Sequence, residues 1–251
     1  MIVDLIKYAV AQPAFVIHGV RKIVQGISWT EPNGLSPELQ MSDLGYGKAK
    51  LTKLVNLYYN PDEVKRAREQ LARRKGAEHS SVAILTRMAP KNTLGTQGHC
   101  IQSIVISEHW GTFKKHLVTA DVFYRSTEAI QKFGADLILL KKIFDDVGVD
   151  PKPVRFYFAN MYISAVFFPL LFRHTDGIKF MEHVRKSDPV FFPTALRGMS
   201  RYLDPHMNYN YGAVRRMRGH RDKLDRGPLD TYMLKHLGVY HKQHMHRKAK
   251  R

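Results

Sequence analysis

Residues 117–148 read LVTADVFYRSTEAIQKFGADLILLKKIFDDVG, and this stretch predicts a strand that runs directly into a helix. β-Branched and aromatic residues fill Leu117–Tyr124, which is typical of a strand. The apolar residues that follow recur at alternating spacings of three and four, so a helix here has one continuous apolar side. Gly148 is expected to end that helix. The apolar residues of the helix are Ile130, Phe133, Leu137, Leu140, Phe144 and Val147.

Residues 101–107, immediately after the lone cysteine Cys100, predict a neighbouring strand because they are rich in isoleucine and valine. A turn that contains His109, Trp110 and Gly111 is expected to connect this strand to the one described above.

Upstream of the cysteine, the sequence predicts a capped helix followed by a strand. Asn60 is a favourable N-cap, Pro61 suits the first helical position, and Glu63 completes a capping box. Gly76 is expected to stop the helix. A strand should follow at Val82–Thr86.

The remaining segments give weaker signals. A short helix is predicted through Leu51, Leu54 and Leu57, and a strand at Val154–Phe158 runs on into Asn160-Met161-Tyr162. A loop is expected from Trp29 to about Asp43, and the opening segment has no clean period. Phe156, Tyr157, Phe158, Phe167 and Phe168 are interpreted as core residues, with a base-stacking platform as the alternative.

Together these elements predict an α/β (α+β) protein in which helices pack over a mixed or antiparallel sheet. The domain is expected to span residues 1–210. From Tyr211 onward the chain carries 12 Lys or Arg, 3 acids and 5 histidines, which predicts a basic C-terminal extension over residues 211–251. A short helix is expected near residues 231–237.

The net charge of +18 favours polyanionic partners, either nucleic acid or phosphorylated substrates. Solubility alone is the simpler explanation of such a charge. The candidate phosphate-contacting residues for DNA or RNA are Arg73, Arg74, Lys75, Arg215, Arg216 and Arg218.

One cysteine excludes an intramolecular disulfide framework and suits a reducing, cytoplasmic setting. The longest apolar stretch, Ile163–Phe172, contains a proline and is too short to span a bilayer. His241, His244 and His246 lack the spacing of a metal site and are interpreted as part of a solvated basic arm, so no metal is predicted.

Cys100 is interpreted in two ways. A thiol between paired strands, with Arg125 at the end of the next strand, suggests an activated nucleophile beside an anion site, because a nearby cation favours the thiolate and binds phosphate. The alternative is a buried structural cysteine.

The order of these elements and the residues at their ends resemble the thymidylate synthase family, which includes the phage pyrimidine-nucleotide hydroxymethylases. The resemblance runs from about Phe15 to Tyr162. Its strongest stretch, Tyr124–Glu128, is similar to the family's Arg-Ser-x-Asp segment. Tyr46-Gly47-Lys48 is similar to the family's Tyr-Gly-Lys step, and residues 17–26 resemble the early helix that carries its catalytic glutamate.

The resemblance implies one-carbon transfer, of a methyl or hydroxymethyl group, to C5 of a pyrimidine deoxynucleotide. Cys100 would add to C6, and C5 would then attack a one-carbon unit carried by methylenetetrahydrofolate. The family forms dimers through its sheet, so a homodimer is also implied. The other implied contacts are Arg125 and Ser126 with the phosphate, Tyr46 with the substrate, Tyr162 and Asn160 with the sugar, and Glu128 with the folate ring.

Asp136 falls where cytosine-using members of the family carry aspartate and uracil-using members carry asparagine. Cytosine offers an amino donor at N4 where uracil offers a carbonyl acceptor, and a carboxylate accepts from an amine but cannot donate to a carbonyl. The resemblance therefore favours cytosine. An ordinary exposed helix acid is the alternative interpretation of Asp136.

Several residues depart from the family pattern. Gly19 stands where the resemblance places the catalytic glutamate, and Ser80 and Ser81 stand where a partner subunit's arginine pair is expected. An alternative function is therefore a catalytically inactive family member that binds nucleic acid as a structural or accessory protein. A third alternative applies the family chemistry to bases within a polymer, which would first require base flipping.

Overall fold

The computed structural model describes residues 1–35, 48–72, 81–86, 100–110, 116–172, 174–203, 231–232 and 235–236. One six-stranded sheet runs through this part of the chain in the order β1-β2-β6-β5-β4-β3. All neighbouring strands are antiparallel except β5 and β6, which are parallel. The strands are β1 (Val16–His18), β2 (Arg21–Glu31), β3 (Ser81–Thr86), β4 (Ile101–Trp110), β5 (His116–Glu128) and β6 (Val154–Ser164).

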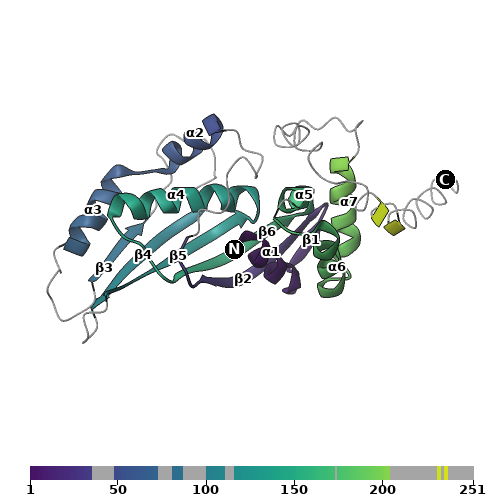
Figure 1. The fold of residues 1–251 in the computed structure, drawn as a ribbon, viewed down its shortest axis with the longest axis horizontal. Helices are drawn as coiled ribbons and strands as arrows, with labels where there is room; N and C mark the ends of the chain where they lie inside the picture. Colours follow the sequence, from purple (N-terminus) through teal and green to yellow (C-terminus); the bar gives the residue numbers. More distant parts are fainter. Residues whose placement is uncertain are drawn as a thin grey trace.

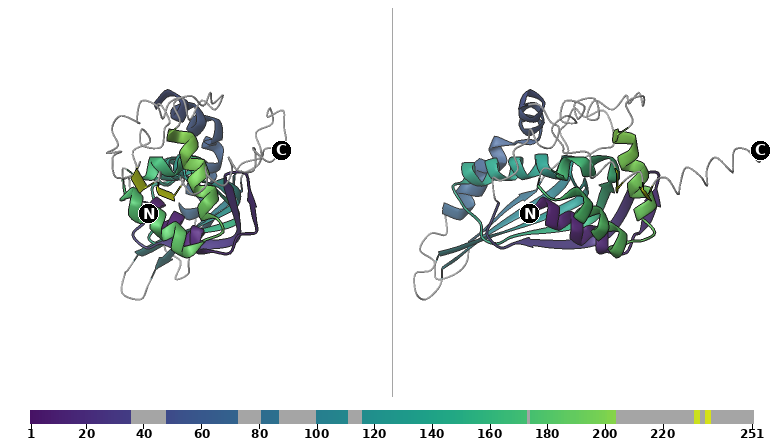
Figure 2. Two further views of the ribbon diagram at one scale, coloured as in Figure 1. Left: turned by 90° about the vertical axis from the view of Figure 1, so that its right-hand side faces the viewer. Right: turned by 45° about the vertical axis from the view of Figure 1, so that its right-hand side comes forward.

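Helices cover one face of the sheet (Figures 1 and 2). The predicted α/β architecture, a mixed sheet covered by helices, is therefore confirmed. The helices are α1 (Ile2–Ala11), α2 (Lys48–Tyr58), α3 (Pro61–Ala72), α4 (Gln131–Val147), α5 (Phe168–Leu171), α6 (Gly177–Ser187) and α7 (Phe192–Leu203), with a 3-10 turn, η2 (Ala165–Phe167), before α5.

Helix α4 links the two parallel strands and forms as its apolar spacing predicts. Its residues Phe133, Leu140 and Phe144 are buried against the sheet. Gly148 ends the helix with a φ of 85°, a left-handed conformation that glycine adopts without a steric cost.

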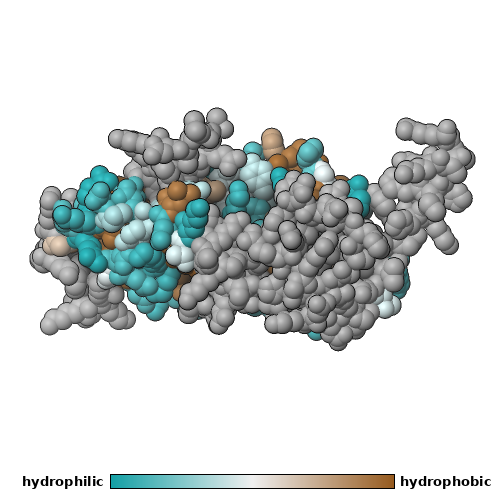
Figure 3. Space-filling model, turned by 90° about the horizontal axis from the view of Figure 1, so that it is seen from above, coloured by the Kyte–Doolittle hydropathy of each residue, from teal (hydrophilic) through white to brown (hydrophobic). Residues whose placement is uncertain are grey.

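Helix α3 begins where its cap predicts. Asn60 Oδ1 accepts a hydrogen bond from the Asp62 backbone N–H at 3.0 Å, and Pro61 is the first helical residue. The described helix ends at Ala72, so Gly76 lies outside the described residues. The helix exposes Lys65, Arg66 and Arg68, and its end of the helix-covered face is largely hydrophilic (Figure 3).

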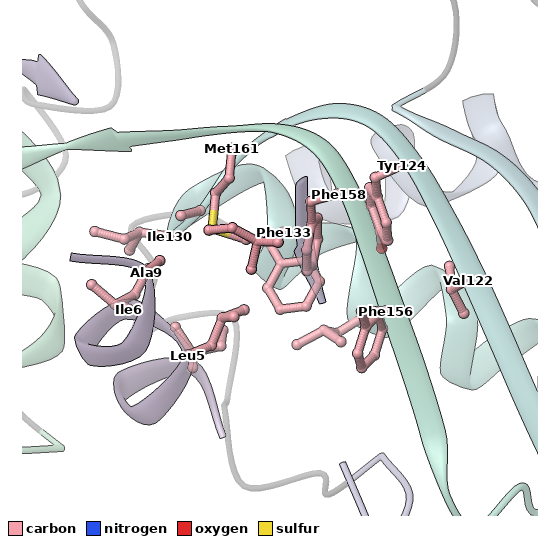
Figure 4. Close-up of a cluster of buried hydrophobic side chains, with 14 of the residues drawn as sticks. Leu5, Ile6, Ala9, Val122, Tyr124, Ile130, Phe133, Phe156, Phe158 and Met161 are labelled. Atoms are coloured by element: carbon pink, nitrogen blue, oxygen red, sulfur yellow. The ribbon is translucent and has the colours of Figure 1, made fainter. Parts of the chain in front are cut away.

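The core lies between the sheet and helices α1 and α4 (Figure 4). Phe133 of α4 meets the rings of Phe156 and Phe158 edge-on, with both centroid distances 5.4 Å. Burying each such side chain contributes about 1.5–3 kcal/mol. The core interpretation of Phe156, Phe158 and Phe168 is confirmed. It is wrong for Tyr157, which lies on the opposite face of the sheet and stacks on Phe123 at 4.8 Å.

Two expectations about the first 31 residues are wrong. Residues 17–26, expected as a helix, form the β1–β2 hairpin, and Gly19 lies in its turn with a φ of 60°. Strand β2 also continues to Glu31, past the predicted start of the loop at Trp29. The helix of this region is instead α1, whose Ile2, Leu5, Ile6, Ala9 and Val10 are buried at helical spacing.

The predicted turn around residues 109–111 also begins too early. His109 and Trp110 belong to β4 and pair with Leu117 and His116 of β5. Both strands are longer than predicted, and residues 111–115 lie outside the described residues.

On four adjacent strands, β2, β6, β5 and β4, the alternation of buried and exposed residues shifts by one position. These shifts lie along one line across the sheet, which we call the sheet kink. On β5 the buried residues Val122 and Tyr124 are followed by Thr127, so the alternation skips one residue. The β4–β5 register shifts between Ile101 and Ser103, as at a β-bulge. The β2–β6 and β5–β6 pairs keep their register there but lack the pairing of one position. The skipped residues are Gly26 on β2, Gln102 on β4, Arg125 on β5 and Ala159 on β6.

Candidate functional site

The sheet kink brings Cys100 and Arg125 together. The Arg125 backbone N–H donates to the Cys100 carbonyl at 3.0 Å, immediately before the β4 bulge. Cys100 is half-buried and packs against the core, while Arg125 is exposed. The two residues are therefore neighbours in the backbone pairing of β4 and β5.

The electrostatic environment of Cys100 combines opposing influences. Burial, followed by the charge of Asp136, raises the pKa of the thiol above its ordinary value. Lys132 and Arg125 act in the opposite direction but do not prevail. Burial and Asp136 thus outweigh the two cations, which is contrary to the expectation of a thiol activated by its neighbours.

Asp136 and Lys132 are supplied by helix α4. Asp136 is half-buried rather than exposed, and its charge acts on Cys100, which disfavours the interpretation of an ordinary surface acid. Glu128, Lys132 and Asp136 follow one another at intervals of four residues, so they line one side of the helix and the turn before it. This spacing could have identified Lys132, which the sequence analysis missed.

Tyr58, the last residue of α2, is a second missed member of the site. Burial raises the pKa of its phenol, and the charges of Cys100 and Asp136 add to the increase. The end of α2 is fixed on α4 by the next residue, since the Tyr59 hydroxyl donates to Asp146 Oδ2 at 2.5 Å. No pattern in the sequence connects Tyr58 to Cys100, because the connection depends on how α2 packs on α4.

Glu128 ends β5 and caps α4. Its Oε2 atom accepts hydrogen bonds from the backbone N–H groups of Gln131 at 2.7 Å and Ile130 at 3.3 Å. Its Oε1 atom is buried and has no hydrogen-bond partner within the described part of the chain. Burial raises the pKa of Glu128 to about 7, against the lowering influence of the backbone donors and Lys132.

The pairing of β5 with β6 places the other predicted substrate residues beside Arg125. Ser126 lies opposite Asn160, and Glu128 lies opposite Tyr162. The Asn160 side-chain amide donates to the Arg125 carbonyl at 3.5 Å. These residues form one row next to the kink.

Gln25 of β2 extends this row and was also missed. Its Nε2 donates to Asn160 Oδ1 at 2.9 Å. Because the Arg125 carbonyl can only accept, Asn160 must turn its amide nitrogen toward it and its oxygen toward Gln25. A hydrogen-bond chain therefore crosses β2, β6 and β5 and reaches Cys100 through the Arg125 backbone.

Some predicted residues lie outside the described residues: Tyr46, Arg73, Arg74, Lys75, Arg215, Arg216 and Arg218. Among the residues that are described, no group of three or more His, Cys, Asp or Glu side chains could hold a metal ion. The described helices include none that is long and apolar enough to cross a membrane.

No protein-family model and no curated protein matches the chain. Among solved structures, the chain is similar to the crystal structure of thymidylate synthase from T4 phage, with 10% sequence identity and a TM-score of 0.44. The match covers 69% of this chain and 79% of the phage enzyme. A likeness of this degree carries no argument about activity.

Proposed function

We propose that the chain transfers a one-carbon group to C5 of a pyrimidine deoxynucleotide, with cytosine favoured and Cys100 as the covalent nucleophile. The observation that supports this proposal is the clustering of Cys100, Lys132 and Asp136 beside the row that ends at Arg125. A thiol, cations and a carboxylate at one place are the groups that such a reaction needs.

Each group has a separate role in the proposed reaction. The Cys100 thiol gives its proton to solvent, its sulfur forms a bond to C6, and the electron pair of the C5–C6 double bond moves toward C4, which leaves C5 nucleophilic. Once C5 carries the one-carbon unit, C5 loses its proton and the C6–S bond breaks, which restores the double bond and returns the thiol. Asp136 accepts a hydrogen bond from the cytosine N4 amino group. Arg125 and Ser126 bind the phosphate, and Asn160 and Tyr162 bind the sugar.

Methylenetetrahydrofolate, when bound, supplies the one-carbon unit. Glu128 suits a folate ring, because its buried Oε1 atom has no partner in the described chain and the ring carries N–H donors. This residue would hold and orient the ring.

We also propose a homodimer that forms through the sheet face away from the helices. This outer face is defined by Val82, Ile84, Val105, Leu117, Phe123 and Tyr157. Ile84 lies opposite Val105, and Phe123 lies opposite Tyr157, in the strand pairing. Ile84 is 56% exposed and Leu117 is 48% exposed. Neighbouring apolar side chains with this much exposure are typical of a surface that binds a partner. Light scattering should give twice the chain mass, and a clear monomer would contradict the dimer.

The function is tested by tritium release from C5-labelled dCMP and dUMP, with and without methylenetetrahydrofolate. Wild type should release tritium faster from dCMP, and Cys100→Ser should abolish the release because the sulfur adduct cannot form. Release that persists in Cys100→Ser would exclude the covalent mechanism.

Two observations favour the alternative, a nucleic-acid-binding protein without catalysis. The segment expected to supply a catalytic glutamate is a hairpin with Gly19 in its turn, and burial raises the pKa of the Cys100 thiol. Absence of tritium release from either nucleotide, together with salt-sensitive binding to DNA or RNA, would establish this alternative.

A further inference from the structure

The positive charge of the chain is concentrated toward its C-terminus. Residues 174–251 contain 17 Lys or Arg and 7 acids, whereas the whole chain contains 40 Lys or Arg and 22 acids. These last 78 residues therefore carry +10 of the total +18, although they are less than a third of the chain. Where the charged residues of this segment lie on the protein decides where a polyanion is attracted.

Tyr232 and His236 contact helices α6 and α7. The Tyr232 hydroxyl donates to Glu182 Oε1 of α6 at 2.7 Å. The His236 ring lies 5.7 Å from the ring of Phe192, at the start of α7, and 4.5 Å from the ring of Tyr232. The described residues of the extension therefore pack on the α6–α7 end of the molecule (Figure 1).

Lysine side chains line the same side of α6. Lys179 and Lys186 are seven residues apart, so they lie on one side of the helix and about 10 Å apart along its axis. Both are exposed, as is Lys235, which precedes His236. We call Lys179, Lys186 and Lys235 the α6 basic stripe.

The carboxylates near the stripe are engaged in contacts within the protein. Glu182, midway between the two lysines of α6, binds Tyr232 and also Arg185 at 2.7 Å. Asp176 accepts from the first backbone N–H groups of α6, and Asp188 pairs with Lys22 at 2.5 Å. Arg185 offsets the charge of Glu182 and Lys22 offsets that of Asp188, which leaves Asp176 against the three lysines of the stripe.

We propose that the α6 basic stripe binds the phosphates of a nucleic acid. Two lysines about 10 Å apart span about three nucleotides of one strand at 3.4 Å each. A membrane surface is a poorer fit, because Phe180, Met181 and Val184 of α6 are buried and the helix has no apolar side to insert into lipid. The proposal deepens the nucleic-acid alternative and rests on charge and contacts remote from Cys100, so it stands or falls independently of catalysis.

The experiment measures binding of the full chain to a fluorescent 20-nucleotide single strand and to its duplex, by anisotropy between 50 and 200 mM KCl. Lys179→Glu/Lys186→Glu should weaken binding at least tenfold and reduce the salt slope for duplex DNA by about 2, since two phosphate contacts are lost. Lys53→Glu/Lys65→Glu is the matched control, because it makes the same charge change on exposed lysines of α2 and α3.

A second variant gives an effect in the opposite direction, which misfolding cannot imitate. Glu182→Gln removes the only acid between the two lysines on α6 while retaining an acceptor for Tyr232, so binding should become tighter. Equal effects of the two double variants, unchanged affinity in Lys179→Glu/Lys186→Glu, or no binding by wild type would overturn the proposal.

Discussion

The reactivity of Cys100 depends on two oppositely charged neighbours on α4. Asp136 raises the pKa of the thiol and Lys132 lowers it. Asp136→Asn should therefore speed alkylation of Cys100 by iodoacetamide at pH 7.5, and Lys132→Gln should slow it, because the thiolate is the reacting species.

Mass spectrometry at timed intervals measures both alkylation rates. Lys141→Gln, which removes an exposed lysine farther along the same helix, controls for the loss of a positive charge. Changes in the same direction for the Asp136 and Lys132 variants would contradict this account of the site.

Glu128 makes the stability of the fold depend on pH. Its pKa of about 7 in the folded chain is above the ordinary 4.5, so the folded state holds the proton over a range in which the unfolded state has lost it. The free energy of unfolding should then fall as pH rises from about 4.5 to 7, by at most about 3 kcal/mol.

Glu128→Gln cannot ionise and should lack this decline, so its stability relative to wild type should improve between pH 5 and pH 8. Urea unfolding at the two pH values measures the difference. Glu69→Gln, at an exposed acid on α3, controls for the loss of a carboxylate. A constant difference between Glu128→Gln and wild type would show that Glu128 stays ionised.

The sequence singled out Cys100 because it is the lone cysteine, and Asp136 because of its place in the family resemblance. Lys132, Tyr58 and Gln25 were missed for a physical reason. Their roles come from proximity across elements, through the packing of α2 on α4 and the pairing of β2 with β6.

At the scale of the element, the sheet kink depends on Gly26. Its φ is 63°, a region that costs other L-residues about 1–2 kcal/mol, and a Cβ atom there would meet no heavy atom within 4 Å. Gly26→Ala should therefore destabilise the chain by about 1–2 kcal/mol, and Gly26→Asn by less, since asparagine tolerates this conformation better.

Urea unfolding of both variants checks this prediction. Gly34→Ala is a useful comparison, because a Cβ there would come within 2.8 Å of the Pro151 carbonyl in addition to its unfavourable φ. Gly34→Ala should lower the free energy of unfolding more than Gly26→Ala does. An equal or smaller loss would contradict the account in which Gly26→Ala suffers from its backbone conformation alone.

The kink also explains which elements the sequence could predict. Helices α3 and α4 have caps or uninterrupted periods, and both appear where they were expected. On β2 the buried side changes between Val24 and Ile27, so the alternation that identifies a strand is broken in mid-strand. The sequence of the β1–β2 hairpin therefore shows neither the pattern of a strand nor that of a loop. The family resemblance led instead to the prediction of a helix.

At the scale of the whole molecule, one buried lysine joins three parts of the fold. Lys22 of β2 is fully buried, and its Nζ donates to the Val10 carbonyl of α1 at 2.6 Å and to Asp188, between α6 and α7, at 2.5 Å. Lys22→Met should cost about 3–5 kcal/mol, because it leaves Asp188 without its partner in a mostly buried position.

The double variant Lys22→Met/Asp188→Asn should recover part of that loss, since the unpaired charge is removed. Urea unfolding of the two single variants and the double variant measures the coupling. Additive losses would show that the ion pair does not connect these elements energetically.

The pairing of β2 with β6 has a consequence for folding during synthesis on the ribosome. Gln25 and its hydrogen-bond partner Asn160 are 135 residues apart. At about 5–20 residues per second, a ribosome takes roughly 7 to 27 s to deliver β6 after β2 has been synthesised. During that interval one edge of β2 has no neighbour, so the nascent hairpin is exposed to aggregation and to chaperones until the second half of the sheet arrives.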